Sequence, residues 1–137
     1  MLSLNKIEYL CYKDASMAEH NLLGNKGEML AARYLAEQGL AVLEYNWRSG
    51  HKEIDLVAKE RDVLVFVEVK TRSSEVFGNV FDAVTPQKMR NIILAADAYI
   101  QKNMIDLPVR FDVVTIVKEG DTHRIEHVRD AFYPNLE

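Results

Sequence analysis

The chain has 137 residues, which is the size of one ordinary domain and is long enough to bury a single hydrophobic core. Hydrophobic residues make up 48% of it and charged residues 28%, a balance that is typical of a globular chain and excludes a disordered one. The net charge of −4 argues against a protein that coats nucleic acid with a broad basic surface, although a local basic cleft is compatible with it.

Residues 1–17 give weak and mixed secondary-structure signals, so we interpret them as an N-terminal appendage and residues 18–137 as a single domain. The chain shows neither a basic segment followed by an apolar one nor a long apolar run, which would mark export or membrane insertion. Its single cysteine, Cys11, excludes an internal disulfide framework and a cysteine-based zinc site. We therefore expect a cytoplasmic protein without a membrane segment.

The first predicted element is a helix over residues 21–38. Apolar and small residues recur there at helical spacing, Asn21 is a favourable N-cap, and Gly39 stands where a glycine commonly ends a helix. On this helix Glu28 shares one face with Ala31 and Leu35, so an acid interrupts a small and apolar stripe.

Three strands are predicted next, over residues 40–47, 52–60 and 62–70. Polar joints of hairpin length separate them, which favours three consecutive antiparallel strands. A loop over residues 71–85 follows, and its segment around Gly78 would cover a substrate if that glycine acts as a hinge.

A second helix is predicted over residues 87–102, with Pro86 suited to its first turn. Its apolar stripe passes through Ile92, Ala95, Ala96 and Tyr99. Residues 110–117 and 123–128 then form two further strands. The order αβββαββ predicts an α/β sheet with helices packed on it.

The third strand, VLVFVEVK, carries the feature on which the functional interpretation depends. Alternate side chains of a strand share a face, so Glu68 and Lys70 follow Leu64 and Phe66 on one side, which changes from apolar to charged at its end. A cross-strand ion pair or a solvated strand end explains most such charges. The ExK pattern alone does not decide between these interpretations and a catalytic one.

Asp55 lies inside an apolar run of the preceding strand, where a carboxylate is costly unless something binds it. Hairpin pairing would bring Asp55 beside Glu68, and close carboxylates raise each other's pKa unless a divalent cation neutralises them. Magnesium prefers hard oxygen ligands of this kind and keeps several waters. Glu28, which alone would be interpreted as a surface-reaching or capping glutamate, then becomes a candidate outer ligand.

These acids, Glu28 on the first helix, Asp55 on the second strand and Glu68-Val69-Lys70 on the third, resemble the active site of the PD-(D/E)xK nuclease superfamily. A closer resemblance is to the YraN-like bacterial family, and it rests on the segments GNKGEMLAARYLAEQGLAVLEYNWR, EIDLVA, LVFVEVKTR and RFDVV. It covers roughly residues 18–133, with a more distant similarity to archaeal Holliday-junction resolvases. The resemblance implies a restriction endonuclease-like α/β fold with a mixed central sheet flanked by helices.

The resemblance also implies that Asp55 and Glu68 ligate Mg²⁺ or Mn²⁺, with the Val69 carbonyl as a further ligand. Lys70 would orient the attacking water and favour its hydroxide form, and Glu28 would act through water or a second ion. Phosphodiester hydrolysis needs such groups: an activated water, a cation on the non-bridging oxygen and stabilisation of the departing oxygen. We expect a metal-dependent nuclease that acts on DNA, in a repair or recombination setting.

Six basic residues flank the acids in the sequence and are candidates to face phosphates. They are Arg48, His51, Lys52, Arg72, Lys88 and Arg90. Most charges of this kind are solvated surface groups. Arg72 and Lys88 are the strongest candidates, because they lie just past the site strand and at the start of the next helix.

A second interpretation belongs to another functional class, a non-catalytic module that binds nucleic acid or protein and keeps the acids for folding. The acidic net charge favours it. A homodimer would suit cleavage of both DNA strands, but no segment identifies a dimer surface. We expect Trp47 and the four histidines to pack or to lie on the surface, because their spacing matches no metal motif.

Overall fold

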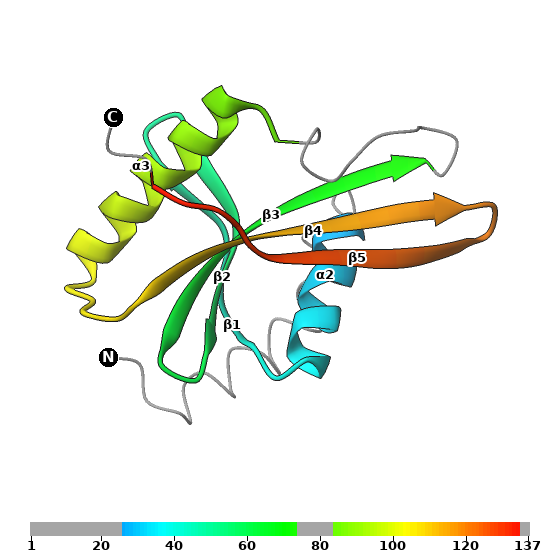
Figure 1. Cartoon of the computed structure of the whole chain (residues 1–137), viewed down its shortest axis with the longest axis horizontal. Coiled ribbons are helices and arrows are strands. Elements are labelled where there is room, and N and C mark those ends of the chain that lie inside the picture. Colours follow the sequence, from blue (N-terminus) through cyan, green and yellow to red (C-terminus); the bar gives the residue numbers. More distant parts are fainter. Residues whose placement is uncertain (1–25, 74–83, 135–137) are drawn as a thin grey trace.

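The computed structural model describes residues 26–73 and 84–134 (Figure 1). The elements are α2 (Lys26–Glu37), β1 (Ala41–Ser49), β2 (Lys52–Glu60), β3 (Val63–Ser73), α3 (Pro86–Lys102), β4 (Val109–Glu119) and β5 (Thr122–Phe132). This order, αβββαββ, confirms the predicted one. The predicted appendage, the helix start at Asn21 and the loop segment around Gly78 lie outside the described residues.

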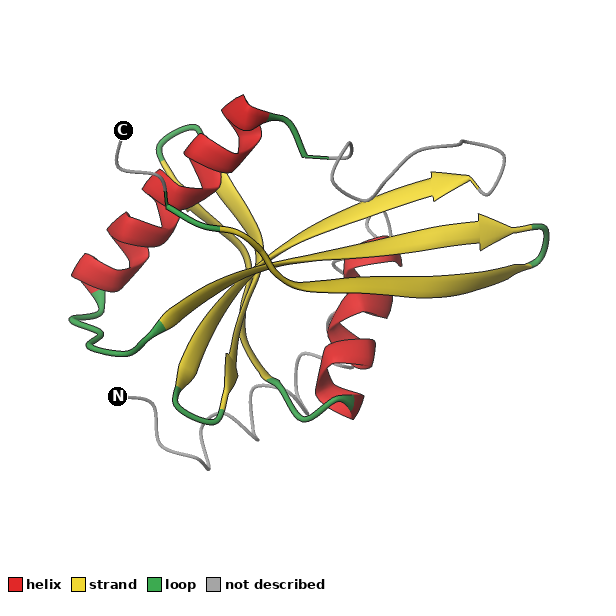
Figure 2. Ribbon diagram, in the orientation of Figure 1, coloured by secondary structure: helices red, strands yellow, loops and turns green. Residues whose placement is uncertain are grey.

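The five strands form one mixed sheet in the order β1-β2-β3-β4-β5. The first three strands are antiparallel neighbours, as predicted, and β4 and β5 are antiparallel as well. Strands β3 and β4 are parallel, so the chain must cross over between them, and α3 is that crossover. The α/β fold with a mixed central sheet flanked by helices is therefore confirmed (Figure 2).

The two helices cover opposite faces of the sheet, and the alternation predicted for β3 decides which residues each helix meets. The α3 face is packed with Leu64, Phe66, Ile92, Ala95, Ala96 and Tyr99. The α2 face is packed with Ala31, Leu35, Val65, Val67 and Ile116. Each fully buried Leu, Ile, Val or Phe side chain stabilises the fold by roughly 1.5–3 kcal/mol.

One end of each helix agrees with the sequence prediction, the C-terminal end of α2 and the N-terminal end of α3. The Leu40 amide donates to the Leu35 carbonyl at 2.9 Å and the Gly39 amide to the Ala36 carbonyl at 3.1 Å, which together form a Schellman motif. Gly39 has φ +94°, a conformation in which a Cβ atom would be strained. Helix α3 begins at Pro86. Neither helix that the structure describes is long and apolar enough to cross a membrane.

Strands β2 and β3 pair over only part of their length. Their ladder runs from Glu60–Val63 to Leu56–Val67, whereas β3 stays paired with β4 as far as Ser73 and β2 stays paired with β1 back to Lys52. The sheet therefore forks beyond Leu56, and we call this point the fork. Figure 1 shows the β1–β2 turn beside α3 and the end of β3 pointing away from it.

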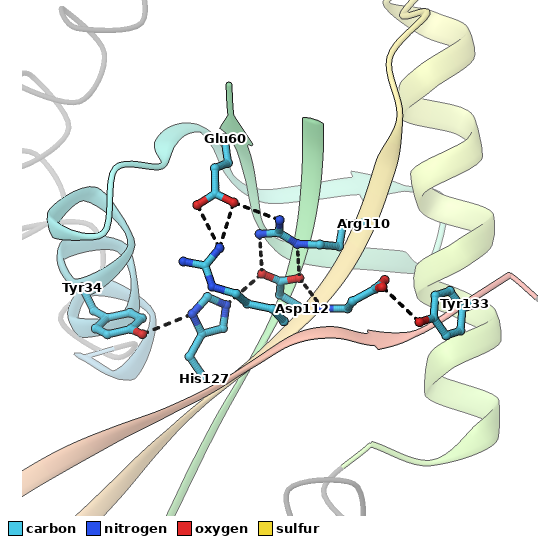
Figure 3. Close-up of polar contacts among 8 residues, drawn as sticks. Tyr34, Glu60, Arg110, Asp112, His127 and Tyr133 are labelled. Carbon is cyan, nitrogen blue, oxygen red and sulfur yellow. Dashed lines mark hydrogen bonds and ion pairs between the residues drawn. The ribbon is translucent and has the colours of Figure 1, made fainter. Parts of the chain in front are cut away.

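A buried carboxylate joins β4, β5 and α2 on the α2 face of the sheet (Figure 3). Asp112 is fully buried and accepts hydrogen bonds from Arg110 at 2.8 and 3.0 Å and from the Asp130 amide at 2.9 Å. His127 contacts Asp112 at 2.8 Å through Nε2 and the Tyr34 hydroxyl at 3.2 Å through Nδ1. Burial alone would raise the pKa of Asp112, but these hydrogen bonds lower it below its usual value.

Replacing Asp112 with asparagine should lower the free energy of unfolding by about 3 kcal/mol, because one partner of a buried ion pair is removed. Among the described residues, Arg110 would then keep Glu60, at 2.9 Å, as its charged partner, while the asparagine oxygen offers it an uncharged acceptor. The control, Glu119→Gln, removes the partner of Arg124 in a more exposed ion pair and should cost less than about 1 kcal/mol. Urea unfolding of both variants measures the difference, and equal losses would contradict this account.

Candidate metal-binding and catalytic site

Asp55 and Glu68 meet at the fork. One step beyond the last β2–β3 pair, Leu56–Val67, the same register brings Asp55 level with Glu68. The two carboxyl groups interact, because Asp55 raises the pKa of Glu68 both through a hydrogen bond and through its charge. The Val69 amide donates to Asp55 Oδ2 at 2.8 Å, so a side chain replaces the backbone partner that this amide would have in a longer ladder. The structure therefore brings together the two acids that the sequence singled out.

Glu68 is the more buried of the two acids, with only 4% of its side chain exposed. Burial, the hydrogen bond to Asp55 and the charge of Asp55 raise the pKa of Glu68, while Lys88 and Lys70 lower it. Lys88 Nζ lies 3.6 Å from Glu68 Oε2, an ion-pair distance that is too long for a hydrogen bond. Glu68 Oε2 is buried and makes no hydrogen bond within the described part of the chain.

Glu28 approaches the acidic pair from α2. Burial raises its pKa to about 7, with a further contribution from the charge of Asp55, and a hydrogen bond with Asn46 opposes the rise. Asn46 itself stands between the β1–β2 pairs Tyr45–Leu56 and Trp47–Ile54, and therefore level with Asp55. Its φ of +48° is an unusual left-handed conformation inside a strand, of the kind that concentrates at functional sites.

A close approach of α2 to β3 positions Glu28. A Cβ atom built on Gly27 would lie 2.4 Å from the Thr71 hydroxyl oxygen, far inside van der Waals contact. A larger residue at position 27 would require either the Thr71 side chain or α2 itself to move. The absence of a side chain at Gly27 therefore lets the neighbouring Glu28 reach the fork.

The donor set suits a hard divalent cation. The N–H and C=O groups of one strand residue point to the same neighbouring strand, so the Val69 carbonyl faces β2 together with the amide that binds Asp55. Two carboxylates, a carbonyl and retained waters are an environment that Mg²⁺ accepts. Among the described residues, no three acidic, histidine or cysteine side chains are gathered closely enough to hold one ion. Glu28 thus stands outside the Asp55–Glu68 pair.

The predicted phosphate-facing residues are scattered around the fork, and three of the six already have acidic partners. Arg48 pairs with Glu53 at 3.4 Å, Arg72 with Glu126 at 3.1 Å and Lys88 with Glu68. Lys52 starts β2 at the open end of the fork. His51 is an exposed residue of the β1–β2 turn, and exposed Arg90 hydrogen-bonds to Gln87.

Two polar residues of this region, Asn46 and Thr115, were not predicted from the sequence. Asn46 carried one signal, a residue of low strand propensity in the middle of a predicted strand. The Thr115 hydroxyl, in the apolar run VVTIV, is buried without a hydrogen-bond partner in the described part of the chain, and its residue pairs with Lys70 across the sheet. Trp47 packs edge-on against Tyr99 with ring centroids 5.2 Å apart, which confirms its predicted packing role.

The family model described as "Uncharacterised protein family UPF0102" matches residues 27–116, a range that contains Glu28, Asp55, Glu68 and Lys70. The chain belongs to this family. UPF0102 is the YraN-like family that the sequence resembles, within the restriction endonuclease-like superfamily, so the predicted resemblance is confirmed.

Relatives of similar length share about half of their residues with the chain. A UPF0102 protein of Phocaeicola vulgatus is 51% identical over 120 residues, covering 88% of this chain and 99% of its own. A UPF0102 protein of Flavobacterium psychrophilum is 45% identical over 117 residues, covering 85% and 98%. A structure of Pyrococcus furiosus SfsA in complex with Ca²⁺ aligns with a TM-score of 0.32 and 12% identity, over 81% of this chain and 63% of that one. A similarity this weak supports no functional argument.

Without metal, the free energy of unfolding should fall as the pH rises from about 5 to 8. Glu28 and Glu68 have raised pKa values, so the folded state keeps protons that the unfolded chain loses above its ordinary glutamate pKa. Glu68→Gln should weaken this fall and melt no lower than the wild type at pH 8. The control is Glu37→Gln, at an exposed position.

Thermal unfolding in EDTA at several pH values measures this effect. If Glu68→Gln instead melts lower than the wild type at pH 8 with an unchanged pH slope, Glu68 acts mainly as the ion-pair partner of Lys88. The interpretation of the acidic pair as strained without a cation would then be wrong.

Proposed function

We propose that this protein is a metal-dependent nuclease that hydrolyses phosphodiester bonds in DNA. The observation that supports the proposal most strongly is the contact between Asp55 and Glu68 at the fork, where Glu68 is almost wholly buried and its Oε2 has no hydrogen-bond partner among the described residues. Folding alone gains little from two neighbouring carboxylates in such a position. A cation that both carboxylates bind gives the arrangement a function.

The groups that would hold Mg²⁺ or Mn²⁺ are the carboxylates of Asp55 and Glu68 and the Val69 carbonyl, with Glu28 acting through water. When bound, such a cation neutralises the acids, polarises a phosphoryl oxygen and makes a coordinated water more acidic. Asp55 is held in one orientation by the Val69 amide. Glu68 is held by its packing, because almost no part of it reaches solvent.

Lys70 would orient the attacking water and favour its hydroxide form. It follows Glu68 by two residues on the same strand and lowers the pKa of Glu68 through its charge, so its ammonium group acts on the acidic pair. A compact ammonium group with three donors suits contact with a water molecule and a phosphoryl oxygen. Lys88 would balance the charge of Glu68 from α3 until substrate arrives.

The second candidate function is a non-catalytic module that binds nucleic acid or protein. The ion pairs of Arg48, Arg72 and Lys88 favour it, since these cations already have partners and are less available for phosphate. The net charge of −4 favours it as well. In this case Glu68 would serve folding as the partner of Lys88, and Lys70 would have no role in chemistry.

Lys70→Met separates the two candidates. If Lys70 orients and activates the water, cleavage should fall by about 100-fold or more while DNA affinity and the metal-induced rise in melting temperature stay nearly unchanged. Lys59→Met, at the far end of β2, is the matched control and should cleave like the wild type.

The experiment combines single-turnover cleavage, fluorescence anisotropy and thermal unfolding on the same proteins. The substrates are single-stranded, duplex, flap and four-way DNA, each with Mg²⁺, with Mn²⁺ and with EDTA. A wild type that cleaves none of them, together with a Lys70→Met variant that only loses stability, would overturn the nuclease proposal and favour the binding module.

A further inference from the structure

A cavity of about 670 Å³ opens on the α2 face of the sheet, next to the acidic pair. The start of α2 forms one wall, and the ends of β3 and β4 with the β4–β5 turn form the other; Figure 1 shows α2 crossing this part of the sheet. Apolar residues line its inner part, namely Leu30, Val69 and Ile116. We call it the α2 cavity.

Cations without acidic partners line the α2 cavity. Lys26 and Lys118 are exposed and make no ion pair with any residue in the ranges 26–73 and 84–134. They differ in this from Arg72 and Arg124 nearby, which pair with Glu126. An unpaired ammonium group keeps its full attraction for a phosphate.

The remaining polar groups of the α2 cavity fit a phosphate and sugar. The hydroxyl group of Thr71 and the imidazole of His123 supply hydrogen-bond donors, whereas the Thr122 hydroxyl donates to the Glu119 carbonyl at 2.9 Å. One acid besides Glu28, the exposed Asp121, lies on the β4–β5 turn. Gly120 carries no side chain and nothing lies within 4 Å of the place where its Cβ atom would be, so backbone there lies open to a ligand.

The α2 cavity shares two residues with the candidate catalytic site. Glu28 and Val69 line the cavity, and the same two residues belong to the site, Glu28 through its proximity to Asp55 and Val69 through its hydrogen bond to Asp55. Glu28 Oε2 is also buried without a hydrogen-bond partner in the described residues. The cavity therefore adjoins the candidate site through Glu28 and Val69, which places a nucleotide in the cavity near the acidic pair.

The size of the cavity decides which form of nucleic acid fits. Its volume lies within the range of roughly 300–1,000 Å³ that is usual for pockets that hold one small ligand. A nucleotide is a ligand of this size. A double helix, whose major groove alone is about 12 Å wide, is far too large to enter.

We propose that the α2 cavity binds one unpaired nucleotide, with its phosphate at Lys26 and Lys118, beside the phosphodiester bond that the acidic pair would cleave. The inference rests on the proposed function and narrows its substrate to a single strand or an unpaired strand end. The unpaired base lies against Leu30, Val69 and Ile116, and the cavity recognises no particular base sequence.

The test is the salt dependence of binding, measured in EDTA so that no cleavage occurs. Fluorescence anisotropy gives the affinity for a single-stranded 12-mer and for a duplex closed at each end by a hexaethylene glycol linker, which leaves no nucleotide unpaired, at several salt concentrations. The variant is Lys26→Ala with Lys118→Ala. The matched control is Lys59→Ala with Lys102→Ala, which removes the same charge from residues that do not line the cavity.

Losing two phosphate contacts should lower the slope of log affinity against log salt by about 1.4 for single strands and weaken binding by roughly 10-fold at moderate salt. The control should bind like the wild type, and the closed duplex should be unaffected by either variant. Matched DNA and RNA 12-mers show which backbone the cavity prefers. All proteins should have the same melting temperature, because the replaced lysines lie at the surface.

Three results would overturn the inference: no binding of single strands by the wild type, equal losses in the variant and the control, or an equal loss for the closed duplex. Its failure is separate from that of the proposed function. If the wild type binds single strands through these lysines but cleaves no DNA, the nucleotide-binding role of the cavity stands and the nuclease proposal is wrong. Cleavage by the wild type together with normal single-strand binding by the Lys26→Ala, Lys118→Ala variant would support the nuclease proposal and rule out the nucleotide-binding role of the cavity.

Discussion

The hydrogen bond from the Val69 amide to Asp55 is the contact on which the candidate site depends. It forms where the β2–β3 ladder ends, so a carboxylate takes the place of a backbone acceptor at the point where the two strands diverge. This contact fixes Asp55 beside Glu68, and the burial of Glu68 then makes two adjacent negative charges costly. Protonation relieves that cost at low pH, and a bound cation would relieve it at neutral pH.

The surrounding elements keep the fork in this shape from both faces of the sheet. Helix α2 approaches β3 closely enough at Gly27 to bring Glu28 to the fork, and α3 directs Lys88 at Glu68 from the other face. On the α2 face, the hydrogen bonds from Asp112 through His127 to Tyr34 tie that helix to β4 and β5. The acids of the site and the Asp112 cluster thus have different roles, since Asp112 has hydrogen-bond partners for both oxygens and Glu68 Oε2 has none among the described residues.

Much of the fold follows from local sequence signals. Hydrophobic alternation in β3 predicted its two faces, and glycine and proline predicted one end of each helix, because these signals act within a few residues. The proximity of Asp55 to Glu68 was predictable for the same reason, since a two-residue turn fixes the register of a hairpin and the two acids directly follow its last pair, Leu56–Val67. The acids of the site therefore belong to the part of the structure that local rules determine.

Local sequence signals do not show which basic side chains can bind phosphate in the folded protein. Arg72 was a strong candidate for phosphate binding, yet it pairs with Glu126, which is 54 residues away and meets it only when β5 joins the sheet. Lys26 and Lys118 carried no sequence signal, because the cavity between them exists only after α2 packs across β3 and β4. Asn46 gave a weak signal, and its left-handed backbone became visible only in the fold.

The claim that Asp55 and Glu68 form a cation site is tested most directly by counting bound ions. Titration with Mn²⁺ at pH 8, followed by electron paramagnetic resonance of the free ion, should show at least one ion bound per wild-type chain. Asp55→Asn keeps an acceptor for the Val69 amide but removes the charge, and it should bind none at the same concentrations. Glu119→Gln, at a distant surface ion pair, should bind like the wild type. Equal Mn²⁺ binding by the wild type and Asp55→Asn, or none by the wild type, would contradict the account.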